Sequence, residues 1–359
     1  MKGHIFMSEW KTVDVRTDPV YTVSIGSGLL DRCGELLRPV IAPCRAAVIS
    51  DDTVAPLYAD AVCDSLRRAG YGVCRRTFPA GEAHKNMTTL AVLLDFLAEE
   101  HLTRSDCVAA LGGGVCGDMA GFAAGCYLRG IRYVHLPTTL LAAVDSSVGG
   151  KTAVDLPAGK NLAGLFWQPA AVLCDTDCLA TLSPALLADG AAEAIKTGVL
   201  SGESLFSLLE SGEPPLPKVI ERCVSYKAGV VERDARENGE RRQLNLGHTA
   251  GHAMEACSGY TVSHGHAVAR GLVLIARAAE KLGWCETPCA ERIAAALGRC
   301  GLPTAPLFTP RQLAEAALAD KKRDGGDITL VIPARIGSCY LKKCPAAELE
   351  RIFAAGWED

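Results

Sequence analysis

Short apolar segments alternate with segments of helical periodicity through the first half of this chain, and this alternation limits its fold more than any other feature. Two helical segments, 59–70 and 88–102, separate the first strand-like segments. The strand-like segments are 46–50, 71–78, 106–111, 132–136 and 170–175. Strands and helices that alternate at this interval are typical of a parallel sheet with crossover helices. We therefore predict an α/β N-terminal domain.

The pattern changes near residue 180. Long helical stretches such as 184–200 and 266–283 follow, and only 327–333 (DITLVIP) is typical of a strand. A length of 359 residues suits two domains. The predicted domains are an α/β domain with a parallel sheet, residues 1–180, and a mainly α-helical domain, residues 181–359.

The composition excludes several classes of protein. With 37 Lys+Arg against 41 Asp+Glu, the net charge of −4 argues against a nucleic-acid binder that works by bulk positive charge. No uncharged apolar run is long enough to span a membrane, and we expect neither a membrane span nor a signal peptide. The 16 cysteines are scattered without any C-x-x-C pair, which favours buried thiols in a reducing cytoplasm.

A glycine-rich segment directly follows the strand-like residues 106–111. Gly112, Gly114 and Gly117 fit the pattern G-x-G-x-x-G. Glycine at such a turn lets the backbone approach a phosphate, and the N-terminus of the next helix supplies N–H donors. The pattern therefore favours a dinucleotide or phosphate site, and the alternative is a tight turn between a strand and a helix.

The acidic residue that usually accompanies this glycine pattern is missing, because nothing acidic lies between Asp118 and Asp145. Asp51, at the end of an earlier strand, is the candidate acceptor for ribose hydroxyls instead. Residues 147–152 (SVGGKT) resemble a P-loop, but position 145 is aspartate where that motif needs glycine. This segment therefore remains a glycine-rich turn.

The same turn carries a candidate anion site. Lys151 lies within it, and Lys160 and Asn161 follow closely in a largely apolar region. Two lysines and an amide together favour binding of an anion. The alternative is that the lysines are solvated in a loop.

Four of the eight histidines fall between residues 248 and 266. His248 and His252 have the i, i+4 spacing that directs two imidazoles from one helical face toward one point, and Glu255 follows about a turn later. His264 begins the next predicted helix. We interpret the cluster as a metal site, although a single histidine would more often be structural.

A catalytic metal site also needs a carboxylate and an open position. Glu193 is the best candidate, because it stands among alanines in a helical stretch where a charge is conspicuous. Lys196 lies three residues later and shares its helical face. Two histidines, one glutamate and a water suit Zn²⁺ in a catalytic role.

These motifs occur in four blocks that resemble one family closely. The blocks are 112–169, which begins GGGVCGDMAGF; 189–198, DGAAEAIKTG; 245–255, NLGHTAGHAME; and 263–268, SHGHAV. In this order they resemble the 3-dehydroquinate synthases, sugar-phosphate cyclases of the shikimate pathway, and the resemblance runs from about residue 46 to 337. It implies an α/β nucleotide-binding domain and a helical domain with the active site between them, NAD, a divalent metal (zinc or cobalt), and a homodimer.

The resemblance also implies a role for individual residues. The implied metal ligands are Glu193, His248 and His264. The implied NAD-binding residues are Asp51, Glu82, Lys85, Gly113, Gly114, Asp118, Thr138 and Thr139. The implied substrate-binding residues are Lys151, Lys160, Asn161, Lys227, Arg241, Arg129, which reaches the neighbouring subunit, and Lys321, which we favour over Lys322. The implied catalytic residues, which move protons or hold hydroxyls, are Asp145, Lys196, Asn245 and His252.

The implied reaction converts 3-deoxy-D-arabino-heptulosonate 7-phosphate into 3-dehydroquinate and phosphate, a step of aromatic amino acid biosynthesis. A small anionic sugar phosphate would explain basic residues gathered in an acidic chain. Two alternatives remain: another NAD- and metal-dependent cyclase or dehydrogenase of the same fold, and a catalytically silent binding protein.

The chain departs from the family pattern at one place. The family usually has glutamate two residues after the third metal ligand, whereas this chain has His266. A carboxylate there would suit the helix dipole and could orient a ligand. The substitution raises two expectations: altered metal affinity, or His266 as a competing ligand.

Overall fold

The computed structural model describes residues 10–212, 214–321 and 326–357, without the side chains of Asp320 and Lys321. The chain divides into two compact units. The first unit is the chain up to Leu182 together with Lys227–Ala235, and the second is Ser183–Tyr226 and the chain from Arg236 onward. Among the described helices, none is both long and apolar enough to cross a membrane.

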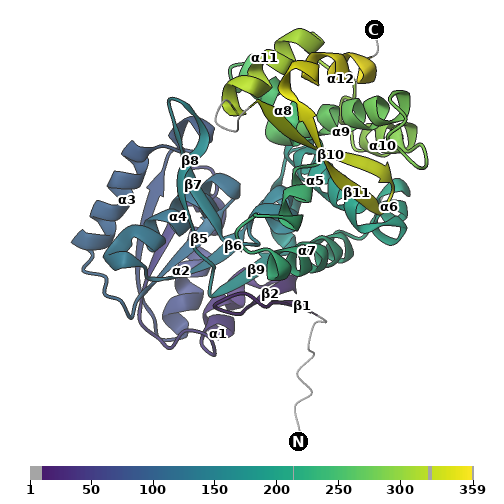
Figure 1. The fold of residues 1–359 in the computed structure, drawn as a ribbon. Helices are drawn as coiled ribbons and strands as arrows, with labels where there is room; N and C mark the ends of the chain where they lie inside the picture. Colours follow the sequence, from purple (N-terminus) through teal and green to yellow (C-terminus); the bar gives the residue numbers. More distant parts are fainter. Residues whose placement is uncertain (1–9, 213, 322–325, 358–359) are drawn as a thin grey trace, which may run out of the picture. The chain divides into compact units, whose positions relative to one another are not determined.

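The first unit is built on a seven-stranded sheet with the order β1-β2-β9-β6-β5-β3-β4 (Figure 1). Its strands are β1 (Lys11–Val15), β2 (Tyr21–Gly26), β3 (Arg45–Asp51), β4 (Gly72–Phe78), β5 (Cys107–Gly112), β6 (Arg132–Pro137) and β9 (Ala171–Asp175). All neighbours are parallel except β1, which pairs antiparallel with β2. The predicted parallel sheet is therefore confirmed, while β1 and β2 escaped sequence analysis.

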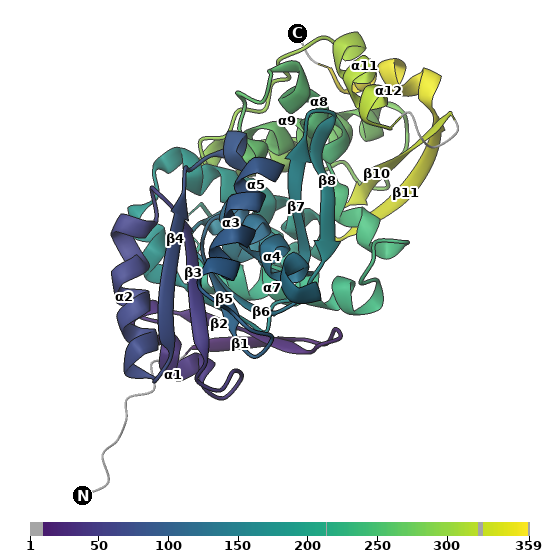
Figure 2. The ribbon, with the colours of Figure 1, turned by 90° about the vertical axis from the view of Figure 1, so that its left-hand side faces the viewer.

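Helices cover both faces of this sheet. The helices are α1 (Cys33–Leu37), α2 (Ala55–Arg68), α3 (Met87–Glu99) and α4 (Gly114–Cys126). Along β3, Ala46 and Val48 pack into the core beside α1 and α2, whereas Ala47 and Ile49 pack into the core beside α3 and α4. Figure 2 shows α2 and α3 on opposite sides of β3 and β4. A strand buried on both faces must be continuously apolar, which explains the runs seen in the sequence.

A β-hairpin follows the sheet strand β6 at the position where the sequence indicated only a glycine-rich turn. Its strands are β7 (Lys151–Leu156) and β8 (Gly159–Phe166), paired antiparallel. A Cβ on Gly164 would lie 2.2 Å from the carbonyl oxygen of Thr152, so only glycine lets the strands approach this closely. The hairpin escaped sequence analysis because its glycines obscure the strand pattern.

The second unit is mainly helical and also contains one antiparallel hairpin. Its helices are α5 (Pro184–Ser201), α6 (Glu203–Glu210), the first part of α7 (Leu216–Arg233), α8 (His248–Cys257), α9 (His264–Lys281), α10 (Ala290–Arg299), α11 (Pro310–Lys321) and α12 (Leu349–Gly356). The hairpin strands are β10 (Asp327–Arg335) and β11 (Ser338–Pro345). The structure thus pairs the predicted strand at 327–333 with a strand that the sequence did not indicate.

Helices α5, α8 and α9 pack at unusually short distances because glycines line their contacts. A Cβ on Gly271 of α9 would lie 2.1 Å from the carbonyl oxygen of Gly247, the residue that precedes α8. A Cβ on Gly265 of α9 would lie 2.3 Å from the Cα atom of Asp189 on α5. These contacts join the three helices that carry the predicted metal ligands.

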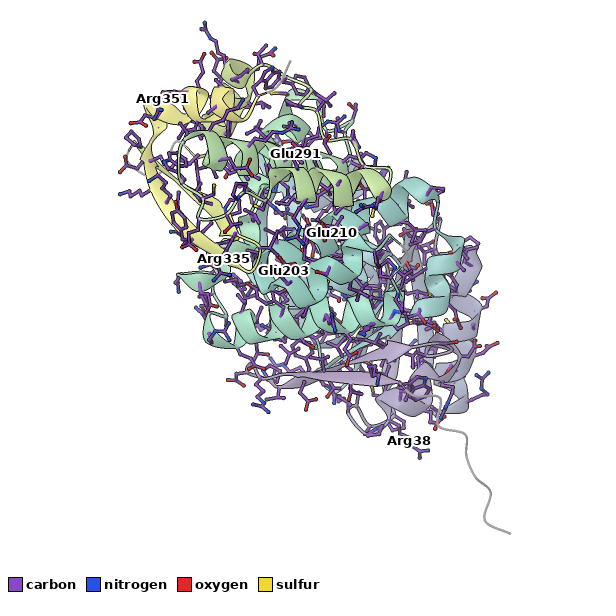
Figure 3. All side chains as sticks on the ribbon, turned by 90° about the vertical axis from the view of Figure 1, so that its right-hand side faces the viewer. Arg38, Glu203, Glu210, Glu291, Arg335 and Arg351 are labelled. Atoms are coloured by element: carbon purple, nitrogen blue, oxygen red, sulfur yellow. The ribbon has the colours of Figure 1, made fainter. Side chains whose placement is uncertain are left out.

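Charged pairs attach α10 to α6 at the surface of the second unit. Arg292 binds Glu203 at 2.7 Å and Glu210 at 2.9 Å, and both glutamates are labelled in Figure 3. All three side chains are partly exposed, so these ion pairs contribute little to stability. None of the three residues is a predicted metal ligand.

We expect Gly271→Ala to lower the melting temperature, with a loss of about 1–3 kcal/mol, because the added methyl group meets a backbone carbonyl that cannot move aside. Gly298→Ala on α10 is the matched control, since nothing lies within 4 Å of its Cβ position. Alanine there should stabilise the helix by about 0.5–1 kcal/mol. Thermal unfolding of both variants measures the difference, and an unchanged melting temperature for Gly271→Ala would contradict the close contact.

We also expect His135 to make stability fall in acid. This β6 histidine lies beneath α4, where a Cβ on Gly117 would be 2.1 Å from its ring, and burial lowers its pKa from 6.5 to about 4. Below pH 6.5 His135 binds a proton in the unfolded chain but stays neutral in the folded chain. The free energy of unfolding therefore decreases as the pH falls toward 4. The loss approaches about 3 kcal/mol.

The variant His135→Phe lacks this titration. Its stability relative to that of the parent protein should therefore improve between pH 7 and pH 4, whatever its stability at pH 7. Parallel curves of unfolding free energy against pH for the two proteins would show that His135 does not contribute.

Candidate active site

The carboxyl ends of the central strands gather several predicted NAD-binding residues of the first unit. The chain leaves β3 for β4 on one side and later reaches β5 on the other side, so the sheet changes direction between β3 and β5. Ligands of open α/β sheets bind at such a point. Asp51 ends β3 there and Gly112 ends β5, and a Cβ on Gly112 would lie 3.4 Å from Oδ2 of Asp51.

The loop after β5 leaves room for a ligand only because it consists of glycines. A Cβ on Gly113 would lie 3.0 Å from Cγ2 of Thr139, and one on Gly114 would lie 3.2 Å from Oγ of Ser146. The N–H group of Thr138 donates to Gly112 at 3.0 Å, while its buried hydroxyl has no hydrogen-bond partner among the described residues. The N-terminus of α4 and this unused hydroxyl fit a phosphate-containing cofactor.

A buried lysine connects the glycine-loop helix to the hairpin. Nζ of Lys85 lies 2.6 Å from Oδ2 of Asp118 on α4 and 2.5 Å from Oδ1 of Asn161 on β8. Burial alone would lower the pKa of Lys85, but the charges of Asp118 and Glu82 outweigh it and the pKa is raised. Lys85 is therefore a fixed positive charge within this network.

The side chains of Lys160 and Glu82, next to this network, are partly exposed. Lys160 lies 3.4 Å from Glu82, which belongs to the short helix η2 (Glu82–His84). Asn161 has a φ of +56°, and its N–H group donates to Asp155 at 2.8 Å. Strained backbone at a residue with a polar side chain is common at binding sites. The structure therefore brings Glu82, Lys85, Lys160 and Asn161 together.

Asp145 and Lys227 form a second charged pair in the first unit. Nζ of Lys227 lies 2.7 Å from Oδ1 of Asp145 and also donates to the carbonyl oxygen of Asp145 at 2.7 Å. Asp145 belongs to η4 (Ala142–Ser146), a π-helix, which is a frequent feature of functional sites. Lys151 is exposed at the start of β7, after Gly149 and Gly150 with φ of +99° and +67°.

Arg129 is displayed on a strained turn. It ends η3 (Tyr127–Arg129), and three consecutive residues there have positive φ: Leu128 at +50°, Arg129 at +68° and Gly130 at +115°. Arg129 is exposed, and no described residue forms an ion pair or hydrogen bond with its side chain. The turn thus holds a guanidinium group out toward solvent.

The predicted metal ligands meet in the second unit. Oε1 of Glu193 lies 3.5 Å from Nε2 of His248 and 3.3 Å from Nε2 of His264. Glu193 is in the middle of α5, and each histidine is the first residue of its helix. Gly247, with a φ of +77°, provides the turn that directs His248 into the cluster. One ligand atom from each residue lies within 4.8 Å of the others, which suits a single cation.

Contacts on the far side of each imidazole orient the nitrogens that face Glu193. Nδ1 of His248 lies 3.1 Å from the carbonyl oxygen of Leu246, and Nδ1 of His264 lies 3.5 Å from Oε2 of Glu255. A partner at Nδ1 leaves Nε2 as the ligand atom. Burial and the charge of Lys196 lower the pKa of His248 to about 3, so this ring is neutral as a ligand must be.

The Glu193 carboxylate itself requires positive charge. It is fully buried, and neither oxygen makes a hydrogen bond of good geometry among the described residues. Nζ of Lys196 lies 2.5 Å from its Oε2 atom. Although burial raises it, the charge of Lys196 and the contacts with His248 and His264 hold the pKa of Glu193 well below its usual range. A buried carboxylate with incomplete hydrogen bonding that faces two imidazole nitrogens fits a divalent metal.

The remaining predicted residues of this unit surround the cluster to different degrees. His252 is exposed one turn after His248, and their rings are 5.3 Å apart between centroids. Arg241 is almost completely buried in η6 (Glu240–Asn245), and Asn245 of the same helix donates to Glu237 at 2.8 Å. Lys322 and the side chain of Lys321 lie outside the described residues.

His266 is oriented by a different partner. Its Nδ1 atom lies 2.7 Å from Oδ1 of Asp189, and it belongs to neither group of possible metal ligands among the described residues. Glu255 is the residue whose role sequence analysis missed. Its spacing of one turn from His252 was visible, but only the fold shows that it contacts His264.

Two family models match consecutive parts of the chain. The one described as 3-dehydroquinate synthase N-terminal matches residues 75–189, and the one described as 3-dehydroquinate synthase C-terminal matches residues 190–323. The 3-dehydroquinate synthase of Neisseria meningitidis serogroup A is 44% identical over 352 residues, which cover 95% of this chain and 98% of the relative. That of Citrifermentans bemidjiense is 47% identical over 317 residues, which cover 85% and 88%.

Solved structures agree on the fold. A 2-deoxy-scyllo-inosose synthase complexed with carbaglucose-6-phosphate, NAD+ and Co2+ has a TM-score of 0.86 and 25% identity, over 96% of this chain and 99% of the other. A 2-epi-5-epi-valiolone synthase from Streptomyces hygroscopicus with NAD+ and Zn2+ has a TM-score of 0.84 and 27% identity, over 94% and 96%. With both family models matched in order and close relatives along nearly its whole length, the chain belongs to the 3-dehydroquinate synthase family.

Proposed function

We propose that this protein is a 3-dehydroquinate synthase, a phosphate-eliminating lyase of the shikimate pathway. It converts 3-deoxy-D-arabino-heptulosonate 7-phosphate into 3-dehydroquinate and phosphate. The observation that carries the proposal is the buried cluster of Glu193, His248 and His264 in a chain 44–47% identical to 3-dehydroquinate synthases over most of its length. A protein that catalyses this reaction takes part in aromatic amino acid biosynthesis.

The proposed cofactors are NAD and a divalent metal, zinc or cobalt. Structural neighbours of this chain hold NAD+ with Co2+ or Zn2+. We assign NAD to the first unit, through Asp51, the glycine loop, Thr138, Thr139 and the network around Lys85. We assign the metal to the second unit, with Glu193, His248 and His264 as its ligands. When bound, NAD supplies a reversible oxidation of one substrate hydroxyl, and the metal lowers the pKa of that hydroxyl.

The basic residues bind an anionic substrate in this proposal. Lys151, Arg129 and Lys321 take the phosphate, and Lys227 and Arg241 take the carboxylate end. A buried arginine such as Arg241 presents a rigid fork that suits a carboxylate, whereas lysine acts as a compact point charge. Lys160 and Asn161 add a donor pair from β8.

Four residues position hydroxyl groups, the departing phosphate or the metal ligand Glu193 in the proposed mechanism. Asp145, paired with Lys227 at 2.7 Å, can accept a hydrogen bond from a substrate hydroxyl. Asn245 can orient a hydroxyl group, and exposed His252 can bind the departing phosphate. Lys196, at 2.5 Å from Glu193, balances the buried carboxylate so that its oxygens remain available as ligands.

We further propose a cytoplasmic homodimer. The strained turn that exposes Arg129 supports a role for this residue across a subunit interface. All 16 cysteines are free thiols, which supports a reducing compartment.

The central test is an assay of phosphate release with catalytic NAD and Zn²⁺ or Co²⁺. We expect stoichiometric phosphate without accumulation of NADH, because a cyclase returns the hydride that it removes. Glu193→Gln should lower the rate by more than about 100-fold and abolish metal retention, since even outer partners of metal ligands change affinity by 10–100-fold. Glu203→Gln, a surface acid of α6 paired with Arg292, is the control and should stay fully active.

Three outcomes would overturn the assignment. Net NADH formation would indicate a dehydrogenase of the same fold, and phosphate release only from a different sugar phosphate would indicate another cyclase. A metal-loaded protein without either activity would indicate a binding protein.

Mixing two inactive variants tests the subunit interface. Arg129→Ala disables each neighbouring site, and Glu193→Gln disables its own site. Subunit exchange at equal concentrations should restore about a quarter of the parental activity, because half of the dimers then contain one intact site. Activity that stays at the level of the separate variants would contradict an exchange of Arg129 between subunits.

A further inference from the structure

The N-terminus of α9, which carries His264, is capped in an unusual way. Ser263 occupies the N-cap position, where a serine hydroxyl ordinarily accepts a hydrogen bond from the first turn. Here the hydroxyl of Ser263 accepts no hydrogen bond from a backbone N–H group of the first turn. It donates to Oδ1 of Asp189 at 2.7 Å and lies 2.8 Å from Nδ1 of His266. The first turn of α9 therefore depends on an acceptor from another helix.

Asp189 supplies that acceptor from α5. Its Oδ1 atom accepts a hydrogen bond from the backbone N–H of His266 at 3.1 Å and lies 2.7 Å from Nδ1 of the same residue. A carboxylate at the start of a helix is also favoured by the helix dipole. Asp189 thus caps α9 in place of Ser263.

The position of Asp189 connects this cap to the ligand cluster. Asp189 lies one turn before Glu193 on α5, and His266 lies two residues after His264 on α9. At the same point the helices touch, since a Cβ on Gly265 would lie 2.3 Å from the Cα atom of Asp189. The three contacts of Asp189 therefore fix how far α9 can slide along α5, and with it the 3.3 Å approach of His264 to Glu193.

We propose that Asp189 is a positioning residue of the metal site, which caps α9 from α5 and so holds the Nε2 atom of His264 against Glu193. The proposal rests on the proposed function only in that Glu193 and His264 bind the metal. It also gives His266 a role: its ring is the partner of the capping carboxylate. A glutamate at 266 would instead face the carboxylate of Asp189.

The test is the affinity of the full-length protein for Zn²⁺, measured by competition with a chromophoric chelator, with the melting temperature of the metal-free protein measured in parallel. Asp189→Ala should raise the dissociation constant about 10–100-fold, the range for lost outer partners of metal ligands. Asp189→Asn keeps an oxygen at the same place and should change the affinity much less. Excess Zn²⁺ should restore binding to Asp189→Ala.

Ser183→Ala is the matched control. Ser183 caps α5 through a hydrogen bond from the N–H group of Leu186 at 3.3 Å, away from the ligands. Its loss should lower the melting temperature by removing a helix cap while leaving the Zn²⁺ affinity unchanged. If Asp189→Ala behaves like Ser183→Ala, with a lower melting temperature and unchanged affinity, the role of Asp189 is structural and the proposal is wrong.

The contact between Asp189 and His266 allows a second test. His266→Glu should weaken Zn²⁺ binding because two carboxylates then meet, and Asp189→Asn in the same chain should recover the affinity. Additive losses in the double variant would contradict the proposal. Both tests read metal affinity and not turnover, so a protein that binds Zn²⁺ normally but releases no phosphate would overturn the proposed function alone.

Discussion

A single buried carboxylate constrains the second unit. Glu193 is completely inaccessible, and an ionised group in that position is tolerated only where positive charge and polar partners meet it. Lys196 supplies the charge from the same helix, and the imidazoles of His248 and His264 supply polar contacts from two others. The helices must consequently approach closely, which explains why glycines line their contacts.

The first unit also contains a buried charge, that of Lys85. Lys85 is as buried as a core residue, and its ammonium group is bonded to Asp118 and Asn161. These partners come from α4 and from β8, so one charged group connects the helix after the glycine loop to the β7–β8 hairpin. In both units, therefore, the geometry of the candidate site follows from the satisfaction of one buried charge.

The sequence predicted the elements whose pattern is produced by burial alone. The strands β3, β5, β6 and β9 are covered on both faces and read as apolar runs, and Glu193 was conspicuous because its neighbours are alanines. The resemblance predicted the cluster of Glu193, His248 and His264 that the structure does assemble. The i, i+4 spacing had instead paired His248 with His252, which the structure places in a different group of possible ligands. The β7–β8 hairpin and β11 were missed, because partly exposed two-stranded ribbons carry no such run. The contacts of Asp189 with α9 could not be predicted either, since Asp189 and His266 are 77 positions apart in the sequence. The contact of Glu255 with His264 depends on how the consecutive helices α8 and α9 pack against each other.

The way the candidate ligands are distributed has a thermodynamic consequence. Every residue assigned to the metal, together with Leu246 and Glu255 that orient the histidines, belongs to one compact unit, and every residue assigned to NAD belongs to the other. Neither ligand set borrows a side chain from the opposite unit. By linkage, any change that NAD causes in the affinity for the metal equals the change that the metal causes in the affinity for NAD. The coupling free energy of the two cofactors thus relates two ligand sets that share no residue.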